Sequence, residues 1–215
     1  MTAVLAGATG LVGGHLLTLL LEDPAYTEIK VLTRKALGKN NPKLKEIIAD
    51  FDQLESYSDC LDADVVFCCL GTTIKTAGSQ AAFKKVDYEY PYRLARITKN
   101  KGAKKYVLIS AMGSDKNSMI FYNRVKGELE EAIEALHFDS YHIIQPSLII
   151  GHRQEKRMGE GLAQKLAPVF DKIMAGPLEK YKSIKAEQIA KAMLAISKSG
   201  ASGTVRHPSN ELQSY

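Results

Sequence analysis

Residues 2–21 run Thr2-Ala-Val-Leu-Ala-Gly7-Ala-Thr-Gly10-Leu-Val-Gly13-Gly14-His-Leu-Leu-Thr-Leu-Leu-Leu21. The apolar run from Ala3 to Ala6 is typical of a buried parallel strand, and the leucines that follow have helical spacing. The turn between strand and helix carries glycines in the spacing G-x-x-G-x-x-G. Gly7 permits a tight turn, Gly10 lets backbone approach a ligand, and Gly13 lets the helix pack on the strand.

This turn predicts a binding site for the pyrophosphate of a dinucleotide. The first N–H groups of a helix have no partner within the helix, and the helix dipole favours an anion at that end. A glycine-rich turn with a purely structural role is the alternative. The order of strand, turn and helix favours the dinucleotide site.

The end of the second predicted strand, Ile29 to Thr33, indicates which dinucleotide. An NAD-preferring site carries Asp or Glu at this position, where it binds the ribose 2′-hydroxyl. Here Arg34 and Lys35 follow the strand instead. An arginine can form a charge-assisted fork on a 2′-phosphate. The sequence therefore favours NADP(H) over NAD, with an exposed basic turn as the alternative.

The rest of the chain alternates further strands and helices, which predicts an α/β fold with a doubly wound parallel sheet. Residues 1–150 form the predicted nucleotide-binding core. Residues 151–215 add a lid segment (152–175) and a closing helix (186–198) to the same domain. Pro91 is expected to kink or divide the helix predicted at 79–101. The other predicted strands are 44–49, 63–70, 105–110 and 141–145, and a long helix is predicted at 119–136.

Two of these strand ends supply further candidates for the cofactor site. Asp50 and Phe51 follow the third strand and are candidate adenine contacts. The fourth strand, Ala63 to Leu70, runs into Gly71, where little side-chain bulk lets main chain line the ribose and pyrophosphate.

Candidate catalytic residues follow the fifth strand. Tyr122 and Lys126 are four apart and share one face of the predicted helix, and Ser110 ends the strand before it. An ammonium beside a phenol favours the phenolate, so Lys126 can prepare Tyr122 for acid–base work while Ser110 orients a carbonyl. The same spacing in Tyr26–Lys30 and Tyr181–Lys185 does not follow that strand. The alternative is a surface tyrosine, a solvated lysine and a strand-ending serine.

Charge, hydropathy and the Cys and His residues argue against several other classes of protein. The net charge is +5, but basic and acidic residues interleave, so we expect no nucleic-acid partner. No apolar run spans a membrane and no signal peptide is visible, so a cytoplasmic protein is expected. Cys60, Cys68 and Cys69 are expected to be buried reduced thiols. The five histidines are scattered, and no metal site is predicted.

Together these residues resemble the atypical short-chain dehydrogenase/reductases of the NAD(P)-binding Rossmann superfamily. The resemblance is closest to the oxidoreductase-like Tat-interacting protein family and covers roughly residues 1–160. The segments that carry it, besides the glycine turn, are Leu32–Lys35, Asp50–Phe51, Phe67–Thr73, Val86–Asp87, Tyr122–Glu128, Phe138–Asp139, Arg153–Glu155 and Arg157. The resemblance implies NADPH contacts at Thr9, Gly10, Leu11, Val12, Arg34, Lys35, Leu70, Gly71, Tyr122, Lys126, Ile149 and Arg157.

This chain departs from that family in two places. Family members often have two serines where it has Ser110-Ala111, so Ser114 or water must substitute if the second serine orients the carbonyl. Where the family tends to have Arg-Pro-Gly, the chain has Gln145-Pro146-Ser147.

The expected function is NADPH-dependent reduction of a small carbonyl compound. The alternatives are an NADPH-sensing regulatory or interaction protein, and an adaptor whose nucleotide site is only structural. The substrate, a protein partner and a homodimer all stay open.

Overall fold

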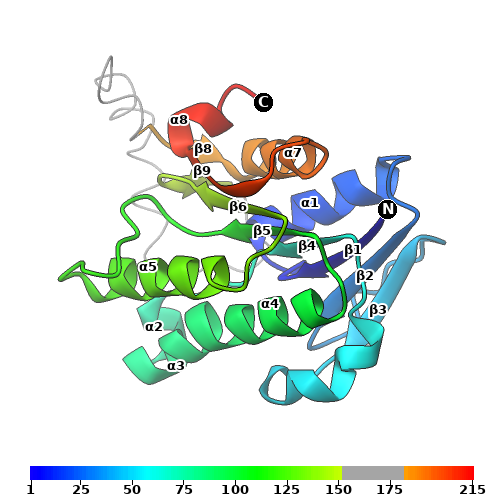
Figure 1. Ribbon diagram of the computed structural model, residues 1–215, viewed down its shortest axis with the longest axis horizontal. Helices are drawn as coiled ribbons and strands as arrows, with labels where there is room; N and C mark the ends of the chain where they lie inside the picture. Colours follow the sequence, from blue (N-terminus) through cyan, green and yellow to red (C-terminus); the bar gives the residue numbers. More distant parts are fainter. Residues whose placement is uncertain (152–181) are drawn as a thin grey trace.

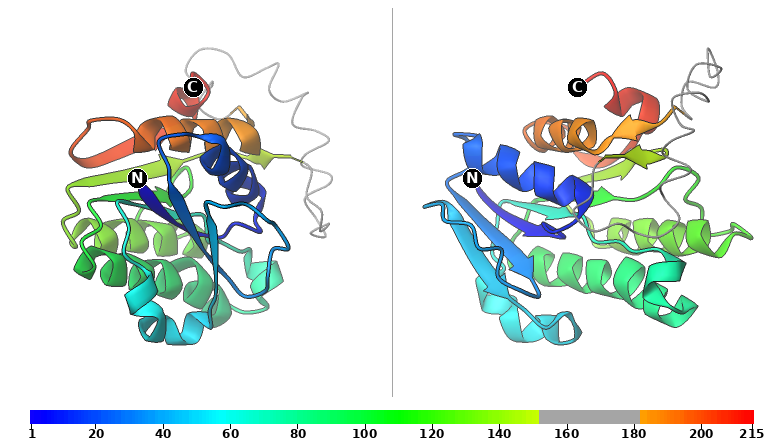
Figure 2. Two further views of the ribbon diagram at one scale, coloured as in Figure 1. Left: turned by 90° about the vertical axis from the view of Figure 1, so that its right-hand side faces the viewer. Right: turned by 180° about the vertical axis from the view of Figure 1, so that it is seen from behind.

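The computed structural model describes residues 1–151 and 182–215. A seven-stranded parallel sheet in the order β3-β2-β1-β4-β5-β6-β9 lies between two layers of helices (Figures 1 and 2). This confirms the predicted doubly wound α/β fold. The strands are β1 (Thr2–Ala6), β2 (Glu28–Thr33), β3 (Leu44–Ile48), β4 (Val65–Cys68), β5 (Lys105–Ile109), β6 (Ser140–Gln145) and β9 (Gly203–Pro208).

Strand β1 lies in the interior of the sheet, where it pairs with β2 on one side and β4 on the other. Residues Ala3 to Ala6 are completely buried, as expected for a strand covered on both faces. The strand order reverses direction at β1 and β4. In open α/β sheets, ligands bind beyond the carboxyl ends of the strands at such a reversal. The fold therefore places the glycine turn after β1 at the expected ligand-binding edge.

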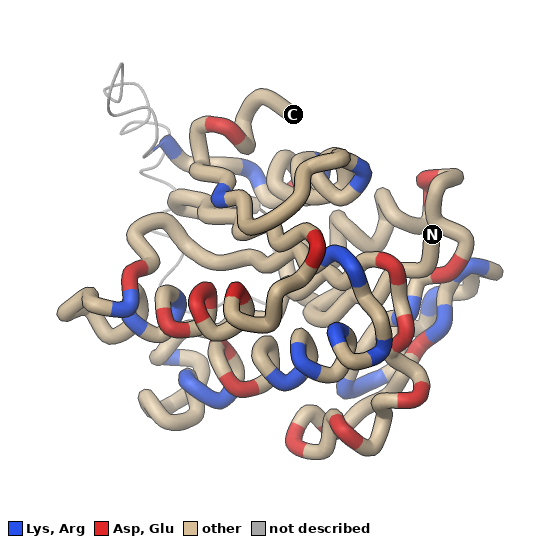
Figure 3. The backbone as a smooth tube through the Cα atoms, in the orientation of Figure 1, with Lys and Arg blue, Asp and Glu red and all other residues tan. Residues whose placement is uncertain are grey.

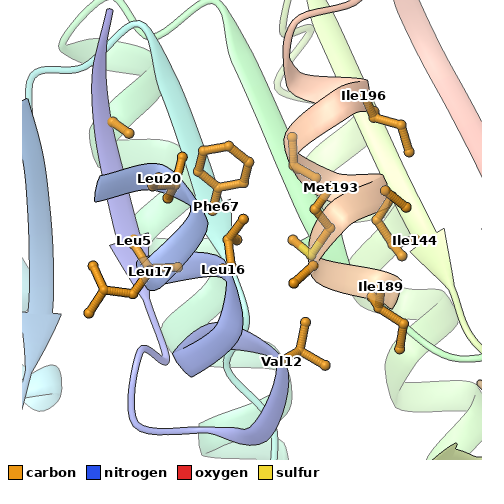
Figure 4. Packing of buried hydrophobic residues seen from close by; sticks show 14 of the residues in the cluster. Leu5, Val12, Leu16, Leu17, Leu20, Phe67, Ile144, Ile189, Met193 and Ile196 are labelled. Atoms are coloured by element: carbon orange, nitrogen blue, oxygen red, sulfur yellow. The ribbon is translucent and has the colours of Figure 1, made fainter. Parts of the chain in front are cut away.

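One face of the sheet is covered by α1 (Leu11–Glu22) and α7 (Ala186–Ser197). Figure 4 shows how their apolar side chains meet over the strands. Leu16, Leu20 and Met193 are completely buried in this cluster, which also includes Phe67 of β4. Burying each of these side chains contributes about 1.5–3 kcal/mol. This packing joins the last part of the chain to the first helix.

The other face is covered by η1 (Phe51–Cys60), α3 (Gln80–Lys84), η2 (Lys85–Glu89), α4 (Tyr90–Asn100) and α5 (Phe121–Glu134). A short helix α2 (Ile74–Ala77) precedes α3. The predicted helix 79–101 is divided next to Pro91, which lies in the first turn of α4. The irregularity is the π-helical turn η2, which ends at Glu89, immediately before α4 begins.

The residues that face inward at the start of this helical segment differ from those predicted. Ala82 and Val86 were expected to be buried, but they are only half-buried. Phe83 and Asp87, one position later, are buried instead.

The C-terminal segment contributes elements that the sequence pattern did not predict. Strand β9 pairs with β6 at the edge of the sheet, and a short helix α8 (Ser209–Leu212) follows it. Two-residue strands β7 (Ile149–Ile150) and β8 (Ile184–Lys185) form a separate parallel pair. The lid segment predicted at 152–175 lies outside the described residues.

Acidic and basic residues lie side by side on the helical face of η1, α4 and α5 (Figure 3). Arg93 and Arg96 both pair with Glu55, and Lys101 pairs with Asp59 at 2.6 Å. Much of the basic charge on this face is therefore matched locally. The absence of a nucleic-acid partner stays a prediction. Within the described ranges, no helix is both long and apolar enough to cross a bilayer.

The cysteines are free thiols, but the expectation that all are buried was wrong for Cys60. Cys60 ends η1 on the outer side of the helical layer and is exposed. Cys68, in the central strand β4, is completely buried, and Cys69 is half-buried.

Candidate functional site

At its glycine positions, the turn after β1 leaves little space for a side chain. A Cβ on Gly7, whose φ is +90°, would lie 2.5 Å from the Cys69 carbonyl oxygen. A Cβ on Gly13 would lie 2.2 Å from the Gly7 carbonyl oxygen, and one on Gly10 would lie 3.1 Å from the same atom. These distances require glycine at Gly7 and Gly13. They also bring the turn against the end of β4.

The start of α1 fits an anion. Its N-cap is Gly10, no described side chain caps the first turn, and that turn contains no acidic residue. Thr9 and Gly10 are exposed, whereas Leu11 is half-buried and Val12 is buried. Val12 could therefore contact a ligand only through its main chain. The uncapped N–H groups and the helix dipole suit the pyrophosphate of a dinucleotide.

Arg34 and Lys35 follow β2 at the same edge of the sheet. The register pairs Ala6 with Leu32, so the glycine turn and the basic pair leave neighbouring strands together. Both cations are exposed, and neither forms an ion pair with a carboxylate of the described residues. The Thr33 hydroxyl donates to the Lys35 carbonyl at 2.7 Å and fixes the turn. Two unmatched cations at this position fit an added phosphate.

Asp50 and Phe51, the candidate adenine contacts, differ in what they expose. Asp50 is exposed and its carboxylate caps η1, accepting from the Asp52 N–H at 2.9 Å. Phe51 is buried, and its ring packs on Tyr90 with 5.5 Å between centroids. Only the main chain of Phe51 is therefore available to a ligand.

The chain beyond β4 links the glycine turn to the candidate catalytic helix. Leu70 is half-buried and Gly71 is exposed. A Cβ on Gly71 would lie 3.4 Å from Asp87 Oδ1 and 3.9 Å from Lys126 Nζ. The main chain at Gly71 thus borders directly on Lys126.

Lys126 forms a buried ion pair. Its Nζ lies 2.8 Å from Asp87 Oδ1, and the two side chains are 4% and 1% exposed. Asp87 Oδ2 accepts from the Thr72 N–H at 2.8 Å. Burial alone lowers the pKa of Lys126, but the charges of Asp87 and Tyr122 outweigh it and hold this pKa above its ordinary value. Lys126 therefore stays an ammonium.

Asp87 was not predicted as a site residue. It comes from the π turn η2, which places it opposite α5. The only signal in the sequence was its presence in the segment Val86–Asp87, one of those that carry the family resemblance. Because Asp87 matches the charge of Lys126, the pair as a whole is close to neutral.

Tyr122 lies one turn before Lys126 on α5 and is half-buried. Its ring packs on Phe83, with 5.6 Å between centroids. No hydrogen bond joins its hydroxyl to another of the described residues. The similarly spaced pair Tyr26–Lys30 is engaged elsewhere, because Tyr26 bonds Ser197 and Lys30 bonds Asp62, at 2.7 Å each. Tyr181 of the third pair lies outside the described residues.

Ser110 is buried at the end of β5, where its Oγ donates to Glu130 Oε1 at 2.5 Å. Gln145 also donates to this carboxylate, at 3.0 and 3.2 Å. Glu130 is itself buried and lies one turn beyond Lys126 on α5. Sequence analysis did not identify Glu130, because a glutamate on a charged helix is usually exposed.

Ile149 lies in β7, beside the start of α1. A Cβ on Gly151, at the end of this segment, would lie 3.0 Å from Leu11 Cδ1. The half-buried Ile149 therefore belongs to the same neighbourhood as the glycine turn. Arg157 lies outside the described residues. Among the residues the structure describes, no three His, Cys, Asp or Glu side chains form a metal-binding cluster.

A doubly wound parallel sheet with a glycine turn and an uncapped helix start at its ligand-binding edge defines a Rossmann-type nucleotide-binding protein. The chain belongs to the family described as NAD(P)H-binding, whose pattern matches residues 7–199. It is thus an NAD(P)-binding, oxidoreductase-like protein.

Curated relatives support this assignment. The chain is 36% identical to protein HTATIP2 of Rattus norvegicus over 163 residues, 74% of this chain and 67% of that protein. It is 34% identical to protein fmp52, mitochondrial, of Aspergillus niger over 210 residues, 94% of this chain and 88% of that protein. The chain is therefore similar to both groups over most of its length. The word mitochondrial in the second name leaves the expected cytoplasmic location a prediction.

Solved structures share the fold at low sequence identity. MoeE5 in complex with UDP-glucuronic acid and NAD has a TM-score of 0.74 and 16% identity, covering 100% of this chain and 80% of that chain. A UDP-glucose 4-epimerase of Thermotoga maritima with UDP-glucose has a TM-score of 0.72 and 16% identity, covering 97% and 77%. These similarities establish that the chain shares the fold of those structures.

Proposed function

We propose that this protein is an NADP(H)-dependent oxidoreductase that reduces a small carbonyl compound with Ser110, Tyr122 and Lys126. One observation carries the proposal. A buried ammonium, Lys126, borders the main chain of Gly71 and lies one helical turn from Tyr122, whose hydroxyl has no hydrogen-bond partner among the described residues. A half-buried phenol beside a fixed cation suits acid–base chemistry.

The residues have separate tasks. The glycine turn would hold the pyrophosphate, and Lys126 would hold the ribose beside the nicotinamide. The bound reduced cofactor supplies the hydride that the carbonyl carbon accepts. Tyr122 gives its proton to the carbonyl oxygen, so the product is an alcohol, and the phenolate regains a proton from solvent. Lys126 stabilises that phenolate while it exists.

Preference for the phosphate-bearing cofactor rests on Arg34 and Lys35. Equilibrium titration should give a lower Kd for NADPH than for NADH, because the 2′-phosphate meets two unmatched cations. Arg34→Asp should reverse the preference. Lys104→Asp makes the same charge change at the opposite edge of the sheet, just before β5, and should leave it unchanged. Equal Kd values for both cofactors in the wild type would contradict the assignment.

Turnover is tested by NADPH oxidation with a broad panel of carbonyl compounds. Tyr122→Phe should abolish oxidation and leave the Kd for NADPH nearly unchanged, because the proton donor is lost and the cofactor contacts remain. Tyr88→Phe, on the outer helical layer, serves as the matched control. If the wild type oxidises NADPH with no member of the panel, the enzyme hypothesis fails.

The alternative is an NADPH-sensing regulatory or interaction protein with little or no turnover. Two features favour it, namely the neutralisation of Lys126 by Asp87 and the alanine at Ala111 in place of a second serine. Both weaken catalysis more than they weaken binding. A partner protein whose capture depends on added NADPH would support this alternative, and equal capture with and without NADPH would count against it.

A further inference from the structure

The hydroxyl of Ser110 donates a hydrogen bond to the buried carboxylate of Glu130. Ser110 is 4% exposed, and Glu130 is 3% exposed. Their oxygens lie 2.5 Å apart, within the range of a charge-assisted O–H···O⁻ bond. Tyr122, Lys126 and Glu130 follow each other at intervals of four on α5, so the carboxylate belongs to the same helix face as the candidate catalytic pair.

The Glu130 carboxylate is surrounded by hydrogen-bond donors. Gln145 donates to both oxygens, and Arg206 Nε of β9 lies 3.6 Å from Oε2. In the hydrogen bond between Ser110 and Glu130, the Ser110 hydroxyl is the donor, and a serine has one hydroxyl proton. The single proton of Ser110 is therefore committed to Glu130, and Ser110 can offer only lone pairs to any other group.

Ser114 is differently placed. It is half-buried, with its Oγ 3.0 Å from Ser110 Oγ and 2.7 Å from the Ala111 carbonyl oxygen. The Ser114 hydroxyl donates to the Ala111 carbonyl, and because the Ser110 proton is committed to Glu130, the Ser114 proton is the one of the two that can turn to another acceptor. Its proton has two uncharged acceptors and is bound to no carboxylate. Turning it toward a substrate costs less than removing the proton of Ser110 from a buried charge.

We propose that Ser114 is the serine that donates to the substrate carbonyl, and that Glu130 is a positioning residue that holds Ser110 as the acceptor behind it. The proposal rests on the proposed function, because it assigns a role within the same carbonyl-reducing site. Ser114 thereby supplies the hydroxyl that Ala111 lacks. The carbonyl oxygen then receives hydrogen bonds from Ser114 and Tyr122, and Ser110 stays bonded to Glu130 throughout.

The first test compares the two serines in steady-state kinetics with a carbonyl substrate from the panel. Ser114→Ala should lower kcat/KM about 100-fold, the size of effect expected for losing one donor to a developing oxyanion. The Kd for NADPH should not change, and Ser114→Thr, which keeps the hydroxyl, should restore most of the activity. Ser110→Ala should lower kcat/KM only severalfold, and Ser118→Ala in the same loop should not lower it. A larger loss for Ser110→Ala than for Ser114→Ala would overturn the assignment.

The second test needs no turnover. Urea unfolding of Ser110→Ala, Glu130→Met and the double variant forms a thermodynamic cycle. Ser110→Ala should reduce the folding equilibrium constant about tenfold more when Glu130 is present than in the Glu130→Met background. If Glu130→Met does not fold, Glu130→Gln replaces it, with a smaller coupling of the same sign. Additive effects would overturn the positioning role of Glu130.

The two tests separate this inference from the proposed function. If the thermodynamic cycle shows coupling but the protein reduces no carbonyl compound, the proposed function is wrong, and so is the role of Ser114. The hydrogen bond that positions Ser110 is then still supported. An additive cycle in an active enzyme would leave the proposed function intact and remove Glu130 from it.

Discussion

Lys126 Nζ and Asp87 Oδ1 lie 2.8 Å apart in a place where neither side chain is more than 4% exposed. A buried pair of this kind stabilises little as a whole, because both charges lose their hydration. Removing one partner is much more costly, since the other charge stays buried and unmatched. Asp87 is therefore required to keep Lys126 charged beside Gly71.

Asp87→Asn tests this condition. The amide keeps an acceptor for the Thr72 N–H but cannot match the ammonium, so we expect a loss of about 3 kcal/mol in the free energy of unfolding. Urea unfolding measures it. The control is Glu131→Gln, which breaks the exposed ion pair between Glu131 and Lys116 and should cost less than about 1 kcal/mol. Similar losses for the two variants would show that burial does not determine the cost.

Gly13 and Gly14 make a second matched pair. A Cβ on Gly13 would meet the Gly7 carbonyl oxygen at 2.2 Å, whereas one on Gly14 would lie 3.5 Å from the Ala8 carbonyl oxygen. Gly13→Ala should therefore cost at least about 2 kcal/mol through overpacking and should weaken NADPH binding. Gly14→Ala should stabilise the helix by about 0.5–1 kcal/mol. Thermal unfolding and an NADPH titration measure both effects, and a tolerated Gly13→Ala would contradict the packing of the turn.

The positions of the inner strands along the chain were predictable because each is a mostly apolar run ended by glycine or polar residues. Strand β9 was not, because it is an edge strand with a mostly half-exposed pattern that ends in Pro208. The inward face of the α3–η2 segment was predicted one residue early, since Phe83 and Asp87 are buried where Ala82 and Val86 were expected.

Some residues of the candidate site were likewise predictable from the sequence, and others were not. Ser110, Tyr122 and Lys126 could be proposed because a strand end and a helix face are local features. Asp87 and Glu130 could not, because the same residue types usually lie in solvent on helices. What buries them is the packing of η2 and β6 against α5, which depends on residues far apart in the chain.

Tyr141 and Tyr106 give opposite predictions for the same substitution. Both are buried, but the Tyr106 hydroxyl donates to the Pro91 carbonyl at 3.0 Å, whereas the Tyr141 hydroxyl has no hydrogen-bond partner within residues 1–151 and 182–215. Tyr106→Phe should cost about 1 kcal/mol, and Tyr141→Phe should be neutral or stabilise by up to about 1 kcal/mol. The midpoints of urea unfolding compare them directly. Equal losses would mean that the Tyr141 hydroxyl finds a partner in solution.

His142 makes stability depend on pH. The residue is 1% exposed, its Nε2 lies 2.9 Å from Ser140 Oγ, and its Nδ1 lies 3.0 Å from His207 Nε2. Burial, with smaller contributions from His207 and Lys105, lowers the pKa of His142 to about 4. In the unfolded chain a histidine has its ordinary pKa of about 6.5, so between these values the unfolded state binds more protons than the folded state.

Stability should therefore fall as the pH is lowered from about 6.5 to about 4, and His142 should account for about 3 kcal/mol of the loss. Urea unfolding at several pH values measures the slope. Carboxylates titrate near the lower limit as well, so the informative quantity is the difference between variants. His142→Gln should flatten the curve across this window, because the group that titrates is gone. His15→Gln changes an exposed histidine on α1 and should leave the slope unchanged. If the two variants have the same slope as the wild type, burial does not lower the pKa of His142 in the folded protein, and His142 makes no contribution to the pH dependence of stability.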